Sequence, residues 1–112
     1  MVIIELGDLK LRAEIFNDPV SKKFLLNLPY EIKITRWGEE LYGPIQADLG
    51  EHNPVPDIPP GGIAYSRKGG FVCIFFGQTP AWPVDHIGNI LDGEWKLLSR
   101  AVIPETIVIN KA

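Results

Sequence analysis

The stretch IAYSRKGGFVCIFFGQTP, residues 63–80, contains two apolar runs joined by the residues RKGG at positions 67–70. Apolar runs on either side of a glycine-containing turn are typical of a β-hairpin. The second run, Phe71–Phe76, is apolar at every position, so it offers no face to water. A strand of this kind packs on both sides. We therefore expect a core against one face of this strand and a cover against the other.

Segments with strand character extend outward from this hairpin in both directions. Val2–Leu6 is apolar and Lys10–Ile15 alternates, and the Gly7-Asp8 pair between them predicts a tight hairpin. Period-two alternation returns at Tyr30–Trp37, where Gly38-Glu39-Glu40 then turns the chain. The other predicted strands are 41–49, 63–66, 71–77, 84–90 (a short strand or turn), 95–102 and 106–109.

One substantial helix is predicted, at about residues 18–28. Asn17 and Asp18 supply capping side chains, and Pro19 is suited to the first helical turn. Pro29 marks the end. The apolar residues of the segment recur at helical spacing and make a face that would cover the strand at 71–76: Val20, Phe24, Leu25 and Leu28.

Composition is consistent with a mainly β chain. The 112 residues include 11 Gly and 10 Pro, so many segments are short and a helix bundle is disfavoured. Four prolines in residues 52–62 predict a stiff connecting loop, because proline has no N–H to donate to a ladder. About eight short strands and one covering helix predict a small closed eight-stranded β-barrel. The length suits a single domain spanning 1–112.

Several function classes are disfavoured by the sequence. No apolar stretch approaches the roughly 20 residues of a membrane helix, and the N-terminus has no signal-like leader. The single cysteine, Cys73, cannot form an internal disulfide, and His52 and His86 lack metal-ligand spacing. The net charge of −3 argues against a nucleic-acid partner. We expect a cytoplasmic protein that binds no metal, cofactor, membrane or nucleic acid.

Two sets of residues resemble known families. Residues 11–20 (LRAEIFNDPV), leading into Lys22-Lys23-Phe24, are similar to the opening strand and helix of cyclophilins. The rest of the chain resembles the small bacterial and archaeal cyclophilin-like family, whose members have largely undetermined function. That likeness is carried by WGEELY at 37–42, GIAY at 62–65, CIFFGQTP at 73–80 and IGNI at 87–90.

The resemblance implies an eight-stranded barrel capped by a helix, and it implies two catalytic residues if the protein isomerises X-Pro bonds. Phe75 falls where the pocket phenylalanine of cyclophilins lies, and Arg36 lies on the strand of the catalytic arginine. The residues around Arg36 do not match the phenylalanine-histidine-arginine signature of cyclophilins. Val84 replaces the pocket histidine, and Ser66 stands where the small family usually has tryptophan.

The remaining candidate residues each have a structural alternative. Arg36 is a ligand-binding guanidinium or, with greater weight, the partner of Glu39 or Glu40 in an ion pair. Tyr42 and Tyr65 line a pocket or lie in the core with satisfied hydroxyls. Gln78 and Thr79 bind a ligand through their loop or stabilise a turn. Adjacent strand residues point to opposite faces, so Glu39 and Glu40 do not form a facing acid–base pair.

The leading hypothesis is a binding protein that holds a small molecule or an extended, proline-containing peptide in an aromatic groove, without catalytic machinery. Its predicted ligand-binding residues are Tyr42, Tyr65, Phe75, Gln78 and Thr79. One alternative is a weak peptidyl-prolyl isomerase that uses Arg36 and Phe75. The other is a structural role in which the exposed indoles of Trp37 and Trp82 form a homo-oligomer interface. Periodicity does not decide whether Phe75 or Phe76 faces the groove.

Overall fold

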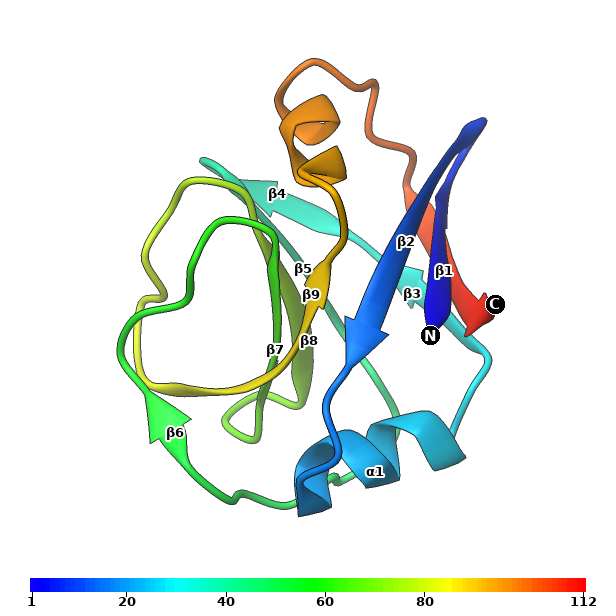
Figure 1. Ribbon diagram of the computed structural model, residues 1–112. Coiled ribbons are helices and arrows are strands. Elements are labelled where there is room, and N and C mark those ends of the chain that lie inside the picture. Colours follow the sequence, from blue (N-terminus) through cyan, green and yellow to red (C-terminus); the bar gives the residue numbers. More distant parts are fainter.

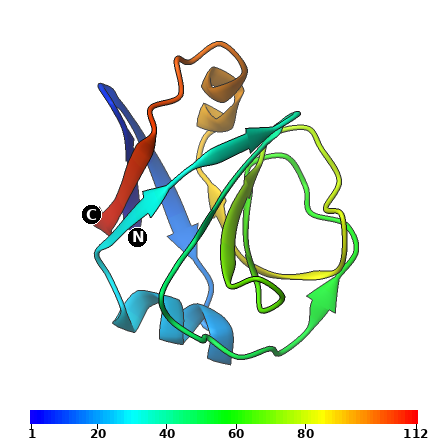
Figure 2. The same cartoon turned by 180° about the vertical axis from the view of Figure 1, so that it is seen from behind.

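The computed structural model describes residues 1–112 and is mainly β (Figures 1 and 2). Two short helices interrupt the strands: α1 (Pro19–Leu26) and the 3-10 helix η1 (Glu94–Ser99). The ten strands are β1 (Val2–Leu6), β2 (Leu9–Ile15), β3 (Tyr30–Lys33), β4 (Thr35–Trp37), β5 (Glu40–Pro44), β6 (Pro54–Val55), β7 (Gly62–Ser66), β8 (Phe71–Phe75), β9 (Val84–Ile90) and β10 (Thr106–Lys111).

The predicted hairpins are confirmed. β1 and β2 pair antiparallel up to Leu6 opposite Leu9, which leaves Gly7 and Asp8 as the turn. β7 and β8 pair with Ser66 opposite Phe71, across the glycine-containing turn. Trp37 lies opposite Glu40, so Gly38 and Glu39 form a third tight turn between β4 and β5.

The prediction of a closed eight-stranded barrel is wrong in two respects: the sheet has ten strands, and its ladder does not close. The strand order is β3-β10-β1-β2-β9-β7-β8-β5-β4, with β6 paired to β9. The two end strands are halves of the predicted strand at 30–37, which breaks at Ile34. β3 contacts β5 without pairing to it, at a point where a side chain on Gly43 would collide with Lys33 and Ile32.

The helix is confirmed but is shorter than predicted, since it ends at Leu26. Asp18 is the N-cap, and its Oδ1 accepts hydrogen bonds from the backbone N–H of Val20 (3.1 Å) and Ser21 (3.0 Å). Figures 1 and 2 show α1 lying across one end of the curled sheet, opposite the end that carries η1. No helix in the structure has the length and apolar character needed to cross a membrane.

The strand predicted at 95–102 is wrong, because this segment forms η1 and a loop. Gly93 takes a left-handed conformation and begins the helix. Leu98 is buried, and Trp95, three residues earlier, packs against the main core. A spacing of three matches one turn of a 3-10 helix. Arg12 holds the segment through an ion pair with Asp92 at 2.6 Å.

The proline-rich loop is a connector, as predicted, and it contributes one short strand. Pro54 and Val55 form β6, which pairs with the start of β9. Asp85 is buried on β9, and its carboxylate accepts hydrogen bonds from the backbone N–H groups of His52 and Asn53. This carboxylate therefore fixes the loop to the sheet.

Alternate residues of β8 belong to two different hydrophobic clusters. Val72, Ile74 and then Phe76 join a main core of 21 residues inside the curled sheet. Cys73 and Phe75 belong to a second cluster of five residues on the outside. The expectation that α1 covers the outer face is wrong, because Phe24 lies in the main core and stacks on Tyr30 at 4.7 Å.

Candidate functional site

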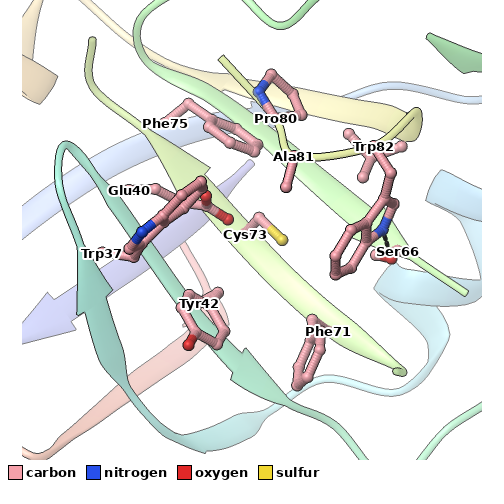
Figure 3. A pocket seen from close by; sticks show the side chains of 11 residues that line it. Trp37, Glu40, Tyr42, Ser66, Phe71, Cys73, Phe75, Pro80, Ala81 and Trp82 are labelled. Atoms are coloured by element: carbon pink, nitrogen blue, oxygen red, sulfur yellow. Dashed lines mark hydrogen bonds between the residues drawn. The ribbon is translucent and has the colours of Figure 1, made fainter. Parts of the chain in front are cut away.

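A pocket of about 330 Å³ lies on the outer face of β5 and β8, beside the loop that precedes β9 (Figure 3). This volume is at the lower end of the range for small-molecule sites, about 300–1,000 Å³. Eight of its eleven lining residues are hydrophobic, and none is Lys, Arg or His. The lining consists of Trp37, Glu40, Tyr42, Ser66, Phe71, Cys73, Phe75, Pro80, Ala81, Trp82 and Val84.

Strand register explains how residues distant in sequence reach this pocket. Trp37 lies opposite Glu40, which in turn lies opposite Phe75, so one row crosses β4, β5 and β8. The next row of the same face brings Tyr42 opposite Cys73. Side chains two residues apart on a strand share a face. Side chains that point to the same face of β4, β5 and β8 thus form one side of the pocket.

The opposite wall comes from the loop between β8 and β9. Its Trp82 indole N–H donates a hydrogen bond to Ser66 Oγ at 2.7 Å, and Ser66 Oγ donates to the carbonyl oxygen of Lys68 at 2.7 Å. The Lys68 ammonium lies 4.5 Å from the Trp82 ring centroid. Figure 3 shows Trp37 and Trp82 on opposite sides of the pocket with Cys73 between them. Two indole side chains therefore form opposite walls of the site, and contacts with Ser66 and Lys68 hold that of Trp82 in place.

Glu40 is the only charged residue that lines the pocket, and just 6% of its surface is exposed. It forms no ion pair. Burial raises the pKa of its carboxyl group, and a hydrogen bond with the Cys73 thiol offsets only part of this rise. Burial, followed by the nearby Glu40 charge and hydrogen bond, raises the pKa of the Cys73 thiol. Cys73 is therefore a neutral thiol and a poor nucleophile here.

Gln78 braces the turn beside the pocket. Its side-chain Oε1 accepts a hydrogen bond from the backbone N–H of Glu39 at 3.0 Å and occupies the space where a side chain on Gly38 would lie. Thr79 is exposed and makes no side-chain hydrogen bond. Neither residue lines the pocket, although both had been predicted to bind ligand.

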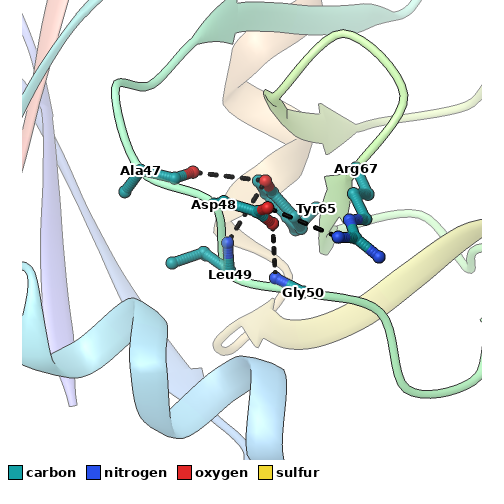
Figure 4. A network of polar contacts seen from close by, with 6 residues as sticks. All are labelled: Ala47, Asp48, Leu49, Gly50, Tyr65 and Arg67. Carbon is teal, nitrogen blue, oxygen red and sulfur yellow. Dashed lines mark hydrogen bonds and ion pairs between the residues drawn. The ribbon is translucent and has the colours of Figure 1, made fainter.

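Tyr65 lies in the main core rather than in the pocket, with 1% of its surface exposed. Its hydroxyl donates a hydrogen bond to the Ala47 carbonyl oxygen at 3.2 Å and accepts one from the Leu49 N–H at 3.3 Å (Figure 4). Beside it, Asp48 accepts from Gly50 and faces Arg67. This network joins β7 to the segment after β5. Of the two predicted tyrosines, only Tyr42 lines the pocket.

Arg36 and Phe75 are not brought together. Phe75 points into the pocket, whereas the Arg36 guanidinium lies 5.2 Å from the ring of Phe76, whose side chain belongs to the main core. Arg36 forms no ion pair with Glu39 or Glu40, and its Nε–H donates to the Gly38 carbonyl oxygen at 2.9 Å. The predicted isomerase pair is thus split between two faces of the sheet.

Sequence reasoning did not select three residues that shape the pocket. Trp82 was considered only for an oligomer interface, Cys73 was not selected as a site residue, and Glu40 was considered as a partner of Glu39 or of Arg36. A signal for Glu40 was present, because an acidic residue two positions before Tyr42 occupies the same strand face. The structure contains no group of three or more His, Cys, Asp or Glu side chains arranged to hold a metal ion.

Comparisons with known proteins identify the fold of this chain. The solution structure of the hypothetical protein AF2241 from Archaeoglobus fulgidus is similar, with 24% identity, a TM-score of 0.77, and coverage of 99% of this chain and 93% of that one. The structure of McbB in complex with tryptophan is also similar, with 17% identity and a TM-score of 0.81. That match covers 99% of this chain but only 44% of McbB. No curated protein matches the sequence.

A sequence model of one family matches nearly the whole chain, from residue 1 to residue 110. The description of that family is "Cyclophilin-like". This agrees with the motifs at 37–42, 62–65, 73–80 and 87–90. The chain belongs to the cyclophilin-like family.

Proposed function

We propose that this protein binds a small molecule with a flat apolar part in the pocket between Trp37 and Trp82. The observation that carries the proposal is a pocket whose mostly apolar walls surround one buried charged group, the carboxyl of Glu40. Sites for small molecules are concave and mostly apolar, and a few polar groups fix the orientation of the ligand.

The geometry favours a compact ligand over a long peptide. The loop at Pro80–Trp82 closes one side of the pocket, and the volume of about 330 Å³ suits a small molecule. Two indoles on opposite sides of the pocket are suited to a planar group, since aromatic rings gain from stacked and edge-to-face contacts. McbB, which shares the fold, has been determined in complex with tryptophan, and this supports an aromatic ligand as the first class to test.

Peptidyl-prolyl isomerisation has less support. The electrostatic help of a guanidinium requires that it face the ring pocket that holds proline. Arg36 contacts Phe76 on the other side of the sheet from Phe75. We expect the folded protein to give no acceleration above buffer in a coupled proline-isomerisation assay, and a rate that falls in an Arg36→Ala variant would contradict this.

The binding proposal is tested by titrating the ¹⁵N-labelled protein with indole, a neutral planar probe, and with a short Ala-Ala-Pro-Phe amide. We expect indole to shift the amide resonances of β8 and of Ala81, Trp82 and Val84, while those of β1, four strands away from β8 in the sheet order, stay in place. Shifts from the peptide alone would favour a peptide groove. No shifts from either probe would refute the proposal.

Sedimentation measurements serve as the control for the interface alternative. Trp37 and Trp82 are 50% and 36% exposed, so a second copy of the chain would cover the same surface as a ligand. If indole shifts the same resonances while the sedimentation coefficient stays constant across protein concentrations, the pocket acts in ligand binding. The interface alternative would be favoured by a dimer that forms as the protein concentration rises and that buries the side chains of Trp37 and Trp82. Added indole would then dissociate this dimer.

A further inference from the structure

The charge of the pocket lining indicates which class of ligand the pocket binds. This inference rests on the proposed function. The only charged group that lines the pocket is the carboxyl of Glu40, which is more than nine-tenths buried and lies among aromatic rings. Five of the lining residues are aromatic, and they come from strands and loop alike: Trp37, Tyr42, Phe71, Phe75 and Trp82.

No cation of the protein neutralises this carboxyl group. The groups of the lining that can titrate or carry charge are Glu40 itself, the Cys73 thiol from β8 and the Tyr42 hydroxyl on β5. The Lys68 ammonium lies over the Trp82 ring at the rim and forms no ion pair with Glu40. A buried carboxylate is stable when it is paired, so the counter-charge is left to the occupant.

We propose that the pocket selects an organic ammonium ion, namely an amine whose charged nitrogen pairs with Glu40 while its apolar part lies between Trp37 and Trp82. Both features of the site attract such a ligand. The carboxylate forms a charge-assisted hydrogen bond with the ammonium group. The faces of aromatic rings attract cations within about 6 Å, most strongly those of Trp.

The same features make other ligand classes bind more weakly. A carboxylate or phosphate ligand meets the Glu40 carboxyl and no positive side chain in the lining. A neutral ligand leaves Glu40 buried without a counter-charge. Burial raises the pKa of Glu40, and a cation paired with the carboxylate would offset the cost of burying its charge.

The test compares three probes of equal ring size in the full chain: 2-phenylethylamine, 2-phenylethanol and phenylacetate, each measured by isothermal titration calorimetry near neutral pH. We expect the amine to bind at least about tenfold more tightly than the alcohol, because hydrogen bonds to charged groups are the stronger class. Phenylacetate should bind most weakly. This ranking requires only the wild-type protein.

Two variants that each remove one negative charge test whether the preference for the amine over the alcohol depends on Glu40. In Glu40→Gln the ratio of amine to alcohol affinity should fall to about one. Glu39→Gln is the matched control, since Glu39 is exposed in the neighbouring turn and does not line the pocket. That variant should keep the preference of the wild type.

The outcomes separate this inference from the proposed function. If the alcohol binds as tightly as the amine, or if Glu40→Gln keeps the preference, the pocket binds small molecules but the ammonium proposal is overturned. If phenylacetate binds best, the charge argument is also overturned. If no probe binds, the proposed function and the ammonium proposal both fail.

Discussion

The two faces of strand β8 have the same apolar character in sequence but contact different things in the structure. On the inner face Val72 and Ile74, continued by Phe76, pack into the main core. On the outer face Phe71, Cys73 and Phe75 line the pocket. The inner face contributes to the stability of the fold, whereas the outer face forms part of a binding surface. Substitutions on the two faces should therefore affect different properties.

The largest effect on stability is expected for Ile74→Ala on the inner face. Ile74 is buried among side chains on all sides, so truncation leaves a cavity that the core cannot fully close. Such changes cost about 2–5 kcal/mol. Cys73→Ala, one residue earlier on the outer face, removes one small group beside the pocket and should cost about 1 kcal/mol. Urea denaturation measures both values, and equal losses would contradict the assignment of the faces.

The two tyrosines that were predicted to bind ligand should differ in their contribution to stability, by less than the effect of Ile74→Ala. Tyr65→Phe removes the acceptor of the Leu49 N–H and the donor to Ala47, and it should lower the free energy of unfolding by about 1–3 kcal/mol. Tyr42→Phe should change stability little, because the Tyr42 hydroxyl has no hydrogen bond within the protein. A Tyr65→Phe variant as stable as wild type would contradict a structural role for its hydroxyl.

The pH dependence of stability tests the burial of Glu40. Its pKa is raised in the folded state, so the unfolded chain ionises first as pH rises above the ordinary glutamate value. Wild-type stability therefore falls relative to Glu40→Gln as pH rises through that value, and the loss is complete above the folded-state pKa. Denaturation at pH 4 and pH 8 measures the gap between the variants. The stability of the wild type minus that of Glu40→Gln should be lower at pH 8 than at pH 4, and a difference that stays constant or rises toward pH 8 would contradict a buried carboxyl.

The smallest effect is expected for Ser66→Ala, which frees the Trp82 indole from its hydrogen bond. The variant also loses the bond from Ser66 Oγ to the Lys68 carbonyl oxygen, so it should lower the free energy of unfolding by about 1 kcal/mol and weaken binding of 2-phenylethylamine by about two- to tenfold. Ser99→Ala is a serine control away from the pocket, and it removes an exposed bond of 3.3 Å to the Lys96 carbonyl oxygen in η1. It should leave affinity unchanged, and an equal loss in both variants would argue against a role for Trp82 in binding.

Local patterning was sufficient to predict most of the fold. The Gly7-Asp8, Gly38-Glu39 and RKGG turns, the Asp18 cap and the family motifs each depend on residues close together in sequence. The strand predicted at 95–102 failed because apolar residues spaced three apart formed a 3-10 turn instead. Closure of the barrel failed because it depends on how β3 and β5 meet at Gly43, a contact between distant segments.

The candidate site was harder to predict than the fold. In the run at 71–76 every residue is apolar, so the sequence contains no alternation that tells the inner face from the outer one. The family likeness pointed to Phe75 as a pocket residue, whereas Tyr42 and Tyr65 were each left between pocket and core; only Tyr42 lines the pocket. Glu40 was not predicted to bind ligand, because it was considered together with its neighbour Glu39 and not with the residues of the adjacent strand. The pocket becomes evident only when the rows across β4, β5 and β8 are aligned.

The most direct test of the central claim uses the three tryptophans as reporters. The protein is labelled with 5-fluorotryptophan, its three ¹⁹F signals are assigned with single Trp→Phe variants, and it is titrated with 2-phenylethylamine. Trp37 and Trp82 line the pocket, whereas Trp95 packs against the main core beside Gly61. We predict that the first two signals shift with one common dissociation constant while the Trp95 signal stays in place. A shift of Trp95 alone, or no shift of Trp37 and Trp82, would contradict it.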